Sequence, residues 1–154
     1  MSSRHPIERL GMSTIEITAA DVNQSEAALL DAAVTAAALV ARADGVVQPI
    51  ERVEMLGVLR RSGFLSATTR FDMLDAFESR LHQLETDEGV EIAVDSLRRF
   101  ARRSPARIVV ETAERVAAAD RHVDGRELQI LRRIHIALSR RMEGANMPLV
   151  ESRI

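Results

Sequence analysis

Two segments of this chain carry the same residue pattern at a constant offset of 76 residues. Residues 44–51 read DGVVQPIE and residues 120–127 read DRHVDGRE, so each segment begins with Asp, has Val three residues later and ends with Glu. The flanking small and apolar residues also match, with Val40, Ala41, Ala43, Met55 and Val58 in the first copy and Val116, Ala117, Ala119, Leu131 and Ile134 in the second. This repeat predicts two copies of one helix-turn-helix unit that pack together.

Helical periodicity dominates the rest of the chain, and no segment alternates as a strand would. We expect helices over about residues 25–43 and 49–61, helices capped by Ser66 and by Thr86, a helix from Ser104-Pro105 to about 119, and a last helix that opens at Asp124. The predicted fold class is all-α, a single helical domain with pseudo-twofold duplicated hairpins. We divide the chain into a partly ordered N-terminal segment (1–24), the helical domain (25–142) and a C-terminal tail (143–154).

Two of these helices carry apolar stripes that we assign to the core. The helix capped by Ser66 has Phe71, Leu74, Phe77 and Leu81, and the last helix has Leu128, Leu131, Ile134 and Leu138. In both cases the spacing of three or four residues places the side chains on one helix face.

The composition excludes several classes of function. The chain has no Cys, so disulfides and thiolate metal sites are ruled out. Its net charge is −2 and it has no Tyr or Trp, so it is a poor candidate for nucleic-acid binding. Because we recognise neither a secretory signal nor a membrane span, we expect a cytoplasmic protein without direct membrane insertion.

The acidic residues of the two copies are candidate metal ligands. Glu51 and Glu127 fall at the third position of their helices, where capping of free N–H groups explains them as well as metal ligation does. Asp44 and Asp120 stand at helix C-termini, where a negative charge is unfavourable. A turn-forming hydrogen bond accounts for one of them, Asp44 especially, whereas the same choice in both copies favours a ligand role. Clustering should raise at least one of the four pKa values when no metal is bound.

The second turn adds Asp124 and His122 as further candidate ligands. Asp120, His122, Asp124 and Gly125 mimic positions one, three, five and six of an EF-hand loop, but Leu131 stands where the Glu at position twelve would be. Oxygen ligands without thiolate suit a hard divalent cation, so Ca²⁺, Mg²⁺ or Mn²⁺ is expected. Zn²⁺ is a candidate only if His122 joins.

Residues 41–47 (ARADGVV) with Glu51, and residues 118–120 (AAD) with Glu127, resemble the TerB family of tellurite-resistance proteins. The same module resembles the helical region of DjlA-type co-chaperones. The resemblance covers about residues 26–141 and implies an all-helical, pseudo-twofold domain whose repeated acidic residues chelate a metal. It also implies a place in cytoplasmic stress-response systems linked to the membrane and to other Ter proteins. Arg121 departs from the pattern, because it replaces the Gly of the first copy and places a cation beside the expected ligands.

The sequence therefore predicts a non-enzymatic, cytoplasmic metal-binding domain in which a bound cation fixes the two hairpins and shapes a docking surface. The expected partners are other stress-response or membrane-associated proteins, and the oligomeric state stays open. A chain without thiols neither reduces nor ligates tellurium through sulfur, so any part in tellurite resistance is indirect. Two alternatives remain, a metal-independent adaptor whose acidic turns bind a basic partner, and a small metallohydrolase.

Overall fold

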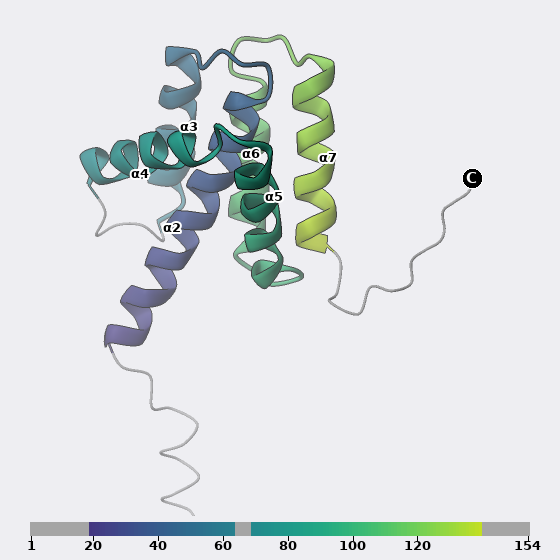
Figure 1. The fold of residues 1–154 in the computed structure, drawn as a ribbon. Coiled ribbons are helices and arrows are strands. Elements are labelled where there is room, and N and C mark those ends of the chain that lie inside the picture. The colour runs from purple at the N-terminus through teal and green to yellow at the C-terminus, as the bar shows by residue number, and fades with distance from the viewer. Residues whose placement is uncertain (1–18, 64–68, 140–154) are drawn as a thin grey trace, which may run out of the picture.

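The computed structural model describes residues 19–63 and 69–139, and every regular element within them is helical. The elements are α2 (Ala19–Arg42), α3 (Pro49–Arg61), α4 (Arg70–Gln83), α5 (Asp87–Ser96), the 3-10 helix η1 (Leu97–Phe100), α6 (Ala106–Ala117) and α7 (Gly125–Ser139). The predicted all-α fold class is confirmed (Figure 1). Over the described ranges, no helix has the length and apolar composition of a membrane span.

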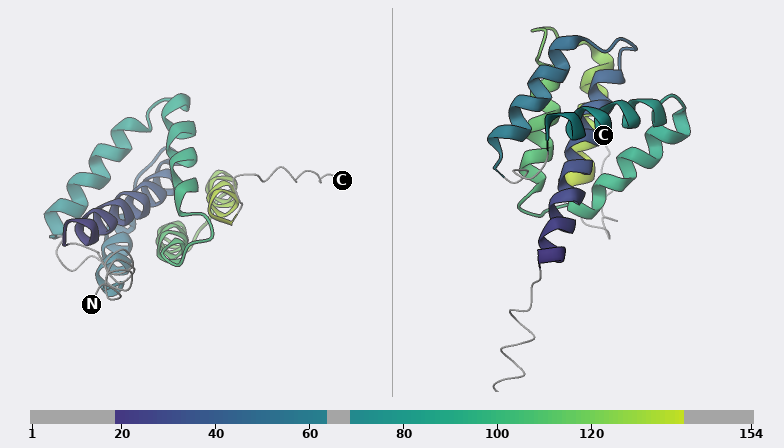
Figure 2. Two further views of the ribbon diagram at one scale, coloured as in Figure 1. Left: turned by 90° about the horizontal axis from the view of Figure 1, so that it is seen from below. Right: turned by 90° about the vertical axis from the view of Figure 1, so that its left-hand side faces the viewer.

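Helix α2 is the centre of the domain. It contacts α3, α4, α5, α6 and α7 (Figures 1 and 2). Each side chain from position 32 to 41 is buried. Six of those ten residues are Ala, which favours the helix and lets neighbouring helices approach closely on several sides. The buried Thr35 hydroxyl donates to the Asp31 carbonyl oxygen at 2.6 Å, so this polar group is satisfied within the helix.

Helices α3 and α7 lie on opposite flanks of the domain, with α6 between them and in contact with both (Figure 1). The two predicted hairpins, α2–α3 and α6–α7, join through extensive packing of α2 against α6. The connections α2–α3 and α6–α7 lie at the same end of the domain (Figures 1 and 2). The pseudo-twofold relation between the hairpins stays a prediction.

Two predicted helix starts are wrong, and a third is shifted by one residue. α2 begins at Ala19, so Ser25 lies inside the helix and the helix crosses the expected boundary at residue 24. Thr69 caps α4 by accepting from the Asp72 N–H at 3.1 Å, and the predicted cap Ser66 lies outside the described residues. α6 begins at Ala106, one residue after Pro105. A Ser caps a helix only where the turn before it is not helical. Packing against the rest of the domain decides whether that preceding turn is helical.

The predicted burial of two residues is also wrong. Phe71 is 79% exposed, and α4 instead buries Met73, Phe77 and Leu81. Leu128 on α7 is exposed, whereas Ile134 and Leu138 are buried and Leu131 is partly buried. Both errors occur in the first turn of a helix, where the spacing permits either of two neighbouring stripes and the packing partner decides between them. The predicted cap at Thr86 and the predicted helix start at Pro49 are confirmed.

Candidate metal centre at the paired acidic turns

Both acidic turns are closed by the Asp that begins them. The Val46 N–H donates to Oδ1 of Asp44 at 3.0 Å, and the His122 N–H donates to Oδ1 of Asp120 at 3.0 Å. Each Asp thus forms an Asx turn with the residue two positions on. The turn-forming hydrogen bond that the sequence suggested for one Asp is therefore present in both turns. This hydrogen bond accounts for an acidic residue at each helix C-terminus.

The residue after each Asp has a left-handed backbone. Gly45 has φ +87° and its N–H donates to the Arg42 carbonyl at 3.0 Å, while Arg121 has φ +64° and its N–H donates to the Ala118 carbonyl at 3.0 Å. Gly adopts this conformation without steric cost, whereas Arg does not. Among the ion pairs of the described residues, none joins Arg121 to a carboxylate, so its guanidinium does not neutralise the turn.

The Glu that ends each segment caps the helix that follows. Oε1 of Glu51 accepts from the Gln48 N–H at 2.7 Å, and Oε1 of Glu127 accepts from the Asp124 N–H at 3.2 Å. Asp124 completes the predicted capping box, because its Oδ1 accepts from the N–H groups of Arg126 and Glu127 at 2.9 and 3.0 Å. Asp124 therefore has a structural role at the start of α7.

Glu51 and Glu127 are almost completely buried, with exposed fractions of 1% and 2%. Burial raises the pKa of Glu51 to about 7, opposed by the Gln48 hydrogen bond and reinforced by the charges of Glu127, Asp44 and Asp120. Burial also raises the pKa of Glu127, again reinforced by Asp44 and Asp120. The predicted rise in pKa is present. Its main cause is desolvation, and the repulsion between the carboxylates is a smaller contribution.

The structure thus brings the charges of Asp44, Glu51, Asp120 and Glu127 within reach of one another, although the two segments are 76 residues apart in sequence. Within residues 19–63 and 69–139, hydrogen bonds use only one oxygen of each carboxylate. The same residues contain no group of three or more His, Asp or Glu side chains assembled closely enough to hold a metal ion. His122 is exposed on the turn.

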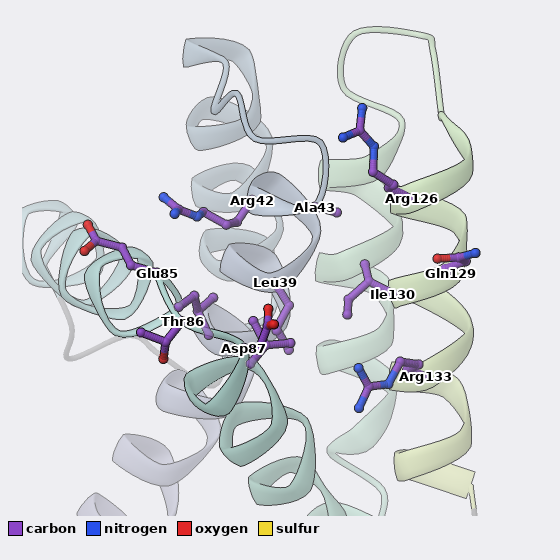
Figure 3. A pocket seen from close by; sticks show the side chains of 12 residues that line it. Leu39, Arg42, Ala43, Glu85, Thr86, Asp87, Arg126, Gln129, Ile130 and Arg133 are labelled. Atoms are coloured by element: carbon purple, nitrogen blue, oxygen red, sulfur yellow. The ribbon is translucent and has the colours of Figure 1, made fainter.

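A recess of about 480 Å³ opens between α2, the corner that joins α4 to α5, and α7 (Figure 3). Arg126 and Arg133 come from α7, whereas Glu85 and Asp87 lie on the opposite side. None of the six predicted ligands is among the described residues that line it. Sequence reasoning missed this recess, because Arg42 of α2 and the arginines of α7 come together only in the folded domain. The one sequence signal was the seven-residue spacing of Arg126 and Arg133.

The fold and the two matched turns define an all-helical domain with an acidic cluster at one end. The chain belongs to the TerB family: the family described as Tellurite resistance protein TerB matches residues 30–142. The resemblance seen in the repeated acidic motif is confirmed by this match. No curated protein and no solved structure matches the chain.

Proposed function

We propose that this TerB-family domain binds one hard divalent cation between its acidic turns and uses it to hold the α2–α3 and α6–α7 hairpins together. The burial of Glu51 and Glu127, two carboxyl groups from different helices, carries the proposal. Neither Glu forms an ion pair with any residue of the described ranges. A buried carboxylate without a counter-charge is destabilising unless it is protonated or bound to a cation.

The raised pKa of Glu51 describes how the metal-free domain avoids this cost, because the folded state holds a proton more tightly than the unfolded chain does. A cation would replace that proton and offset the repulsion from Asp44 and Asp120. Each of these carboxylates keeps a second oxygen that no hydrogen bond within the described residues uses. The donor set therefore fits a cation that prefers oxygen.

Binding requires side-chain movement, because the described side chains do not already form a site of three ligands. Asp120 is exposed and Asp44 is partly exposed, so these two side chains have access to solvent and can turn toward the buried glutamates. Asp124 already accepts two backbone hydrogen bonds and His122 is exposed, so we rank both below the other four as ligands. Without His122 the ligands are all oxygens, which favours Ca²⁺, Mg²⁺ or Mn²⁺ over Zn²⁺.

We further propose that the domain is not an enzyme and acts by presenting a surface that the bound cation stiffens. None of the four carboxylates lines the recess beside α7. Membership of the TerB family supports a place in a tellurite-resistance or stress-response system, with stress-response or membrane-associated proteins as partners in the cytoplasm. Since the chain has no Cys, this role does not involve thiol chemistry on tellurium.

A metal-independent adaptor is the second candidate. Its supporting observation is that Asp44, Asp120 and Asp124 each have a local hydrogen-bonding role, so their presence does not require an ion. An exposed Asp120 would then attract a basic partner through charge alone.

The deciding experiment is metal analysis of tag-free protein purified without chelator, followed by thermal unfolding of the chelator-treated protein with Ca²⁺, Mg²⁺, Mn²⁺ and Zn²⁺ in turn. We expect about one ion per chain and a rise in Tm with one of the first three cations. A flat Tm with all four cations would rule out the metal centre and favour the adaptor.

A further inference from the structure

Another recess, of about 410 Å³, lies where α2, η1 and the start of α6 meet. Its volume is within the range of small-molecule sites. Its described lining includes three apolar and three charged residues, Ala28, Leu29, Phe100, Glu26, Arg99 and Arg103. Leu29 and Phe100 are buried and form an apolar floor, whereas Arg99 and Arg103 are exposed at the rim.

This recess is at the end of the domain opposite to the acidic turns (Figure 1). Leu29 lies about 20 Å from the C-terminal end of α2, where the first acidic turn begins, at 1.5 Å per residue. None of the six candidate metal ligands is among the described residues that line the recess. A ligand bound here would therefore not compete with the proposed cation.

The charged rim belongs to a strongly basic segment. Residues 96–110 contain no acidic residue and five arginines, Arg98, Arg99, Arg102, Arg103 and Arg107. All five are exposed. Within the part of the chain that the structure describes, Arg98 pairs with Asp95 at 3.1 Å, and the other four form no ion pair. The guanidinium groups of Arg99 and Arg103 are therefore available to an anion.

Contacts within the domain hold both arginines beside the apolar floor. Cζ of Arg99 lies 5.9 Å from the centre of the Phe100 ring, which is a cation–π distance. The Arg103 N–H donates to the Phe100 carbonyl at 3.0 Å. The Arg102 N–H donates to the Leu138 carbonyl of α7 at 2.8 Å. The connection from η1 to α6 is thus tied to the core, so little ordering is needed when a ligand binds.

We propose that this recess binds a small amphiphilic carboxylate, whose apolar chain packs on the floor and whose head group pairs with Arg99 and Arg103. A guanidinium group binds a carboxylate through paired N–H donors. Glu26 restricts the charge of the ligand, because two arginines and one glutamate leave a single net positive charge in the lining. This charge matches a monoanion and disfavours a dianion such as a phosphate monoester.

Isothermal titration calorimetry of the full chain in EDTA tests the proposal, with decanoate below its micelle concentration as the probe. We expect saturable binding, which Arg103→Gln should weaken roughly tenfold because charged hydrogen bonds are lost. Arg107→Gln is the matched control and should bind as the wild type does, since Arg107 is exposed in the same basic segment but does not line the recess. Absence of decanoate binding, or equal weakening by both variants, would overturn the proposal.

The chemistry of the ligand is tested by separating its two parts. Decanol has the chain without the charge, and inorganic phosphate has charge without the chain, so both should bind much more weakly than decanoate. Decyl phosphate should also bind more weakly than decanoate, and Glu26→Gln should reduce this difference because it removes the repulsion of the second negative charge. Decanol or inorganic phosphate that binds as tightly as decanoate would contradict an amphiphilic anion site.

Filling the recess tests its position. Ala28→Leu adds volume to the wall, whereas Ala27→Leu adds the same volume to an exposed position of α2 outside the recess. Leu is a good helix former, and circular dichroism melting checks that both variants are folded. Ala28→Leu should weaken decanoate binding roughly tenfold, through lost apolar contact, and Ala27→Leu should leave it unchanged. Equal binding by these two variants would place the ligand elsewhere and overturn the proposal.

Discussion

Gly45 and Arg121 occupy the same left-handed position in two turns that lie 76 residues apart, with φ of +87° and +64°. Each donates its N–H to the carbonyl three residues earlier, and each follows an Asp that forms an Asx turn. Two different residue types therefore adopt one backbone conformation, and only the Gly adopts it without strain.

The first prediction concerns this strain. Arg121→Gly should raise the free energy of unfolding by about 1 kcal/mol, because the left-handed conformation is unfavourable for a residue with a Cβ. Gly45→Ala should lower it by about 1 kcal/mol, and this cost comes from the backbone alone because a Cβ at position 45 meets nothing within 4 Å. Urea unfolding of both variants measures the two changes, and changes of the same sign would contradict the shared conformation.

The second prediction is a pH dependence of stability. The folded pKa of Glu51, about 7, lies above the ordinary value of 4.5. Its contribution is therefore fully present below about pH 4.5 and is lost as pH rises toward 7. The loss should reach about 3 kcal/mol in metal-free protein, at about 1.4 kcal/mol per pKa unit.

Glu51→Gln supplies the control for this prediction, because the amide cannot ionise but its oxygen can still accept from the Gln48 N–H. Urea unfolding at pH 5 and pH 8 should show a smaller loss of stability in the variant than in the wild type. A bound cation favours the carboxylate form, so adding the cation should also reduce the loss in the wild type. Equal losses in wild type and variant would show that other groups cause the dependence.

The third prediction tests the proposed ligands. Asp44→Asn and Asp120→Asn keep an oxygen that can close the Asx turn but remove a formal charge from the cluster. Each should therefore leave metal-free Tm nearly unchanged and abolish most of the cation-induced rise, which corresponds to about 2.7 kcal/mol at a hundredfold excess of cation over Kd. The double variant should lose little more than either single variant, because both remove the same bound ion. Full additivity would point to two separate sites.

The fourth prediction follows from the corrected start of α4. Thr69→Ala should lower the free energy of unfolding by about 1 kcal/mol, because the Thr69 side chain accepts from the Asp72 N–H. Thr69→Ser keeps the accepting oxygen and should remain within about 0.5 kcal/mol of the wild type. Chemical unfolding of the pair measures the contribution of the cap, and equal stability of Ala and Ser at this position would contradict it.

Local sequence was sufficient to predict the helical class and the chemistry of the turns. Thr86 and Asp124 mark helix starts through side-chain hydrogen bonds, and Pro49 marks one because its fixed φ and missing N–H suit the first helical position. All three were placed correctly. The matching motifs also identified the acidic residues that share one end of the domain. These features depend on interactions within three or four residues, which the sequence specifies directly.

The packed structure decided the rest. Whether Phe71 or Met73 enters the core depends on which face of α4 meets α2. The two apolar stripes of α4 that contain these residues are nearly equivalent in sequence. The burial of Glu51 and Glu127, and with it the raised pKa of Glu51, arises from helices that meet only after folding. The recess at the junction of α2, η1 and α6 likewise forms only once these helices meet. Desolvation and surface exposure are properties of the assembled helices, so residue spacing alone could not predict them.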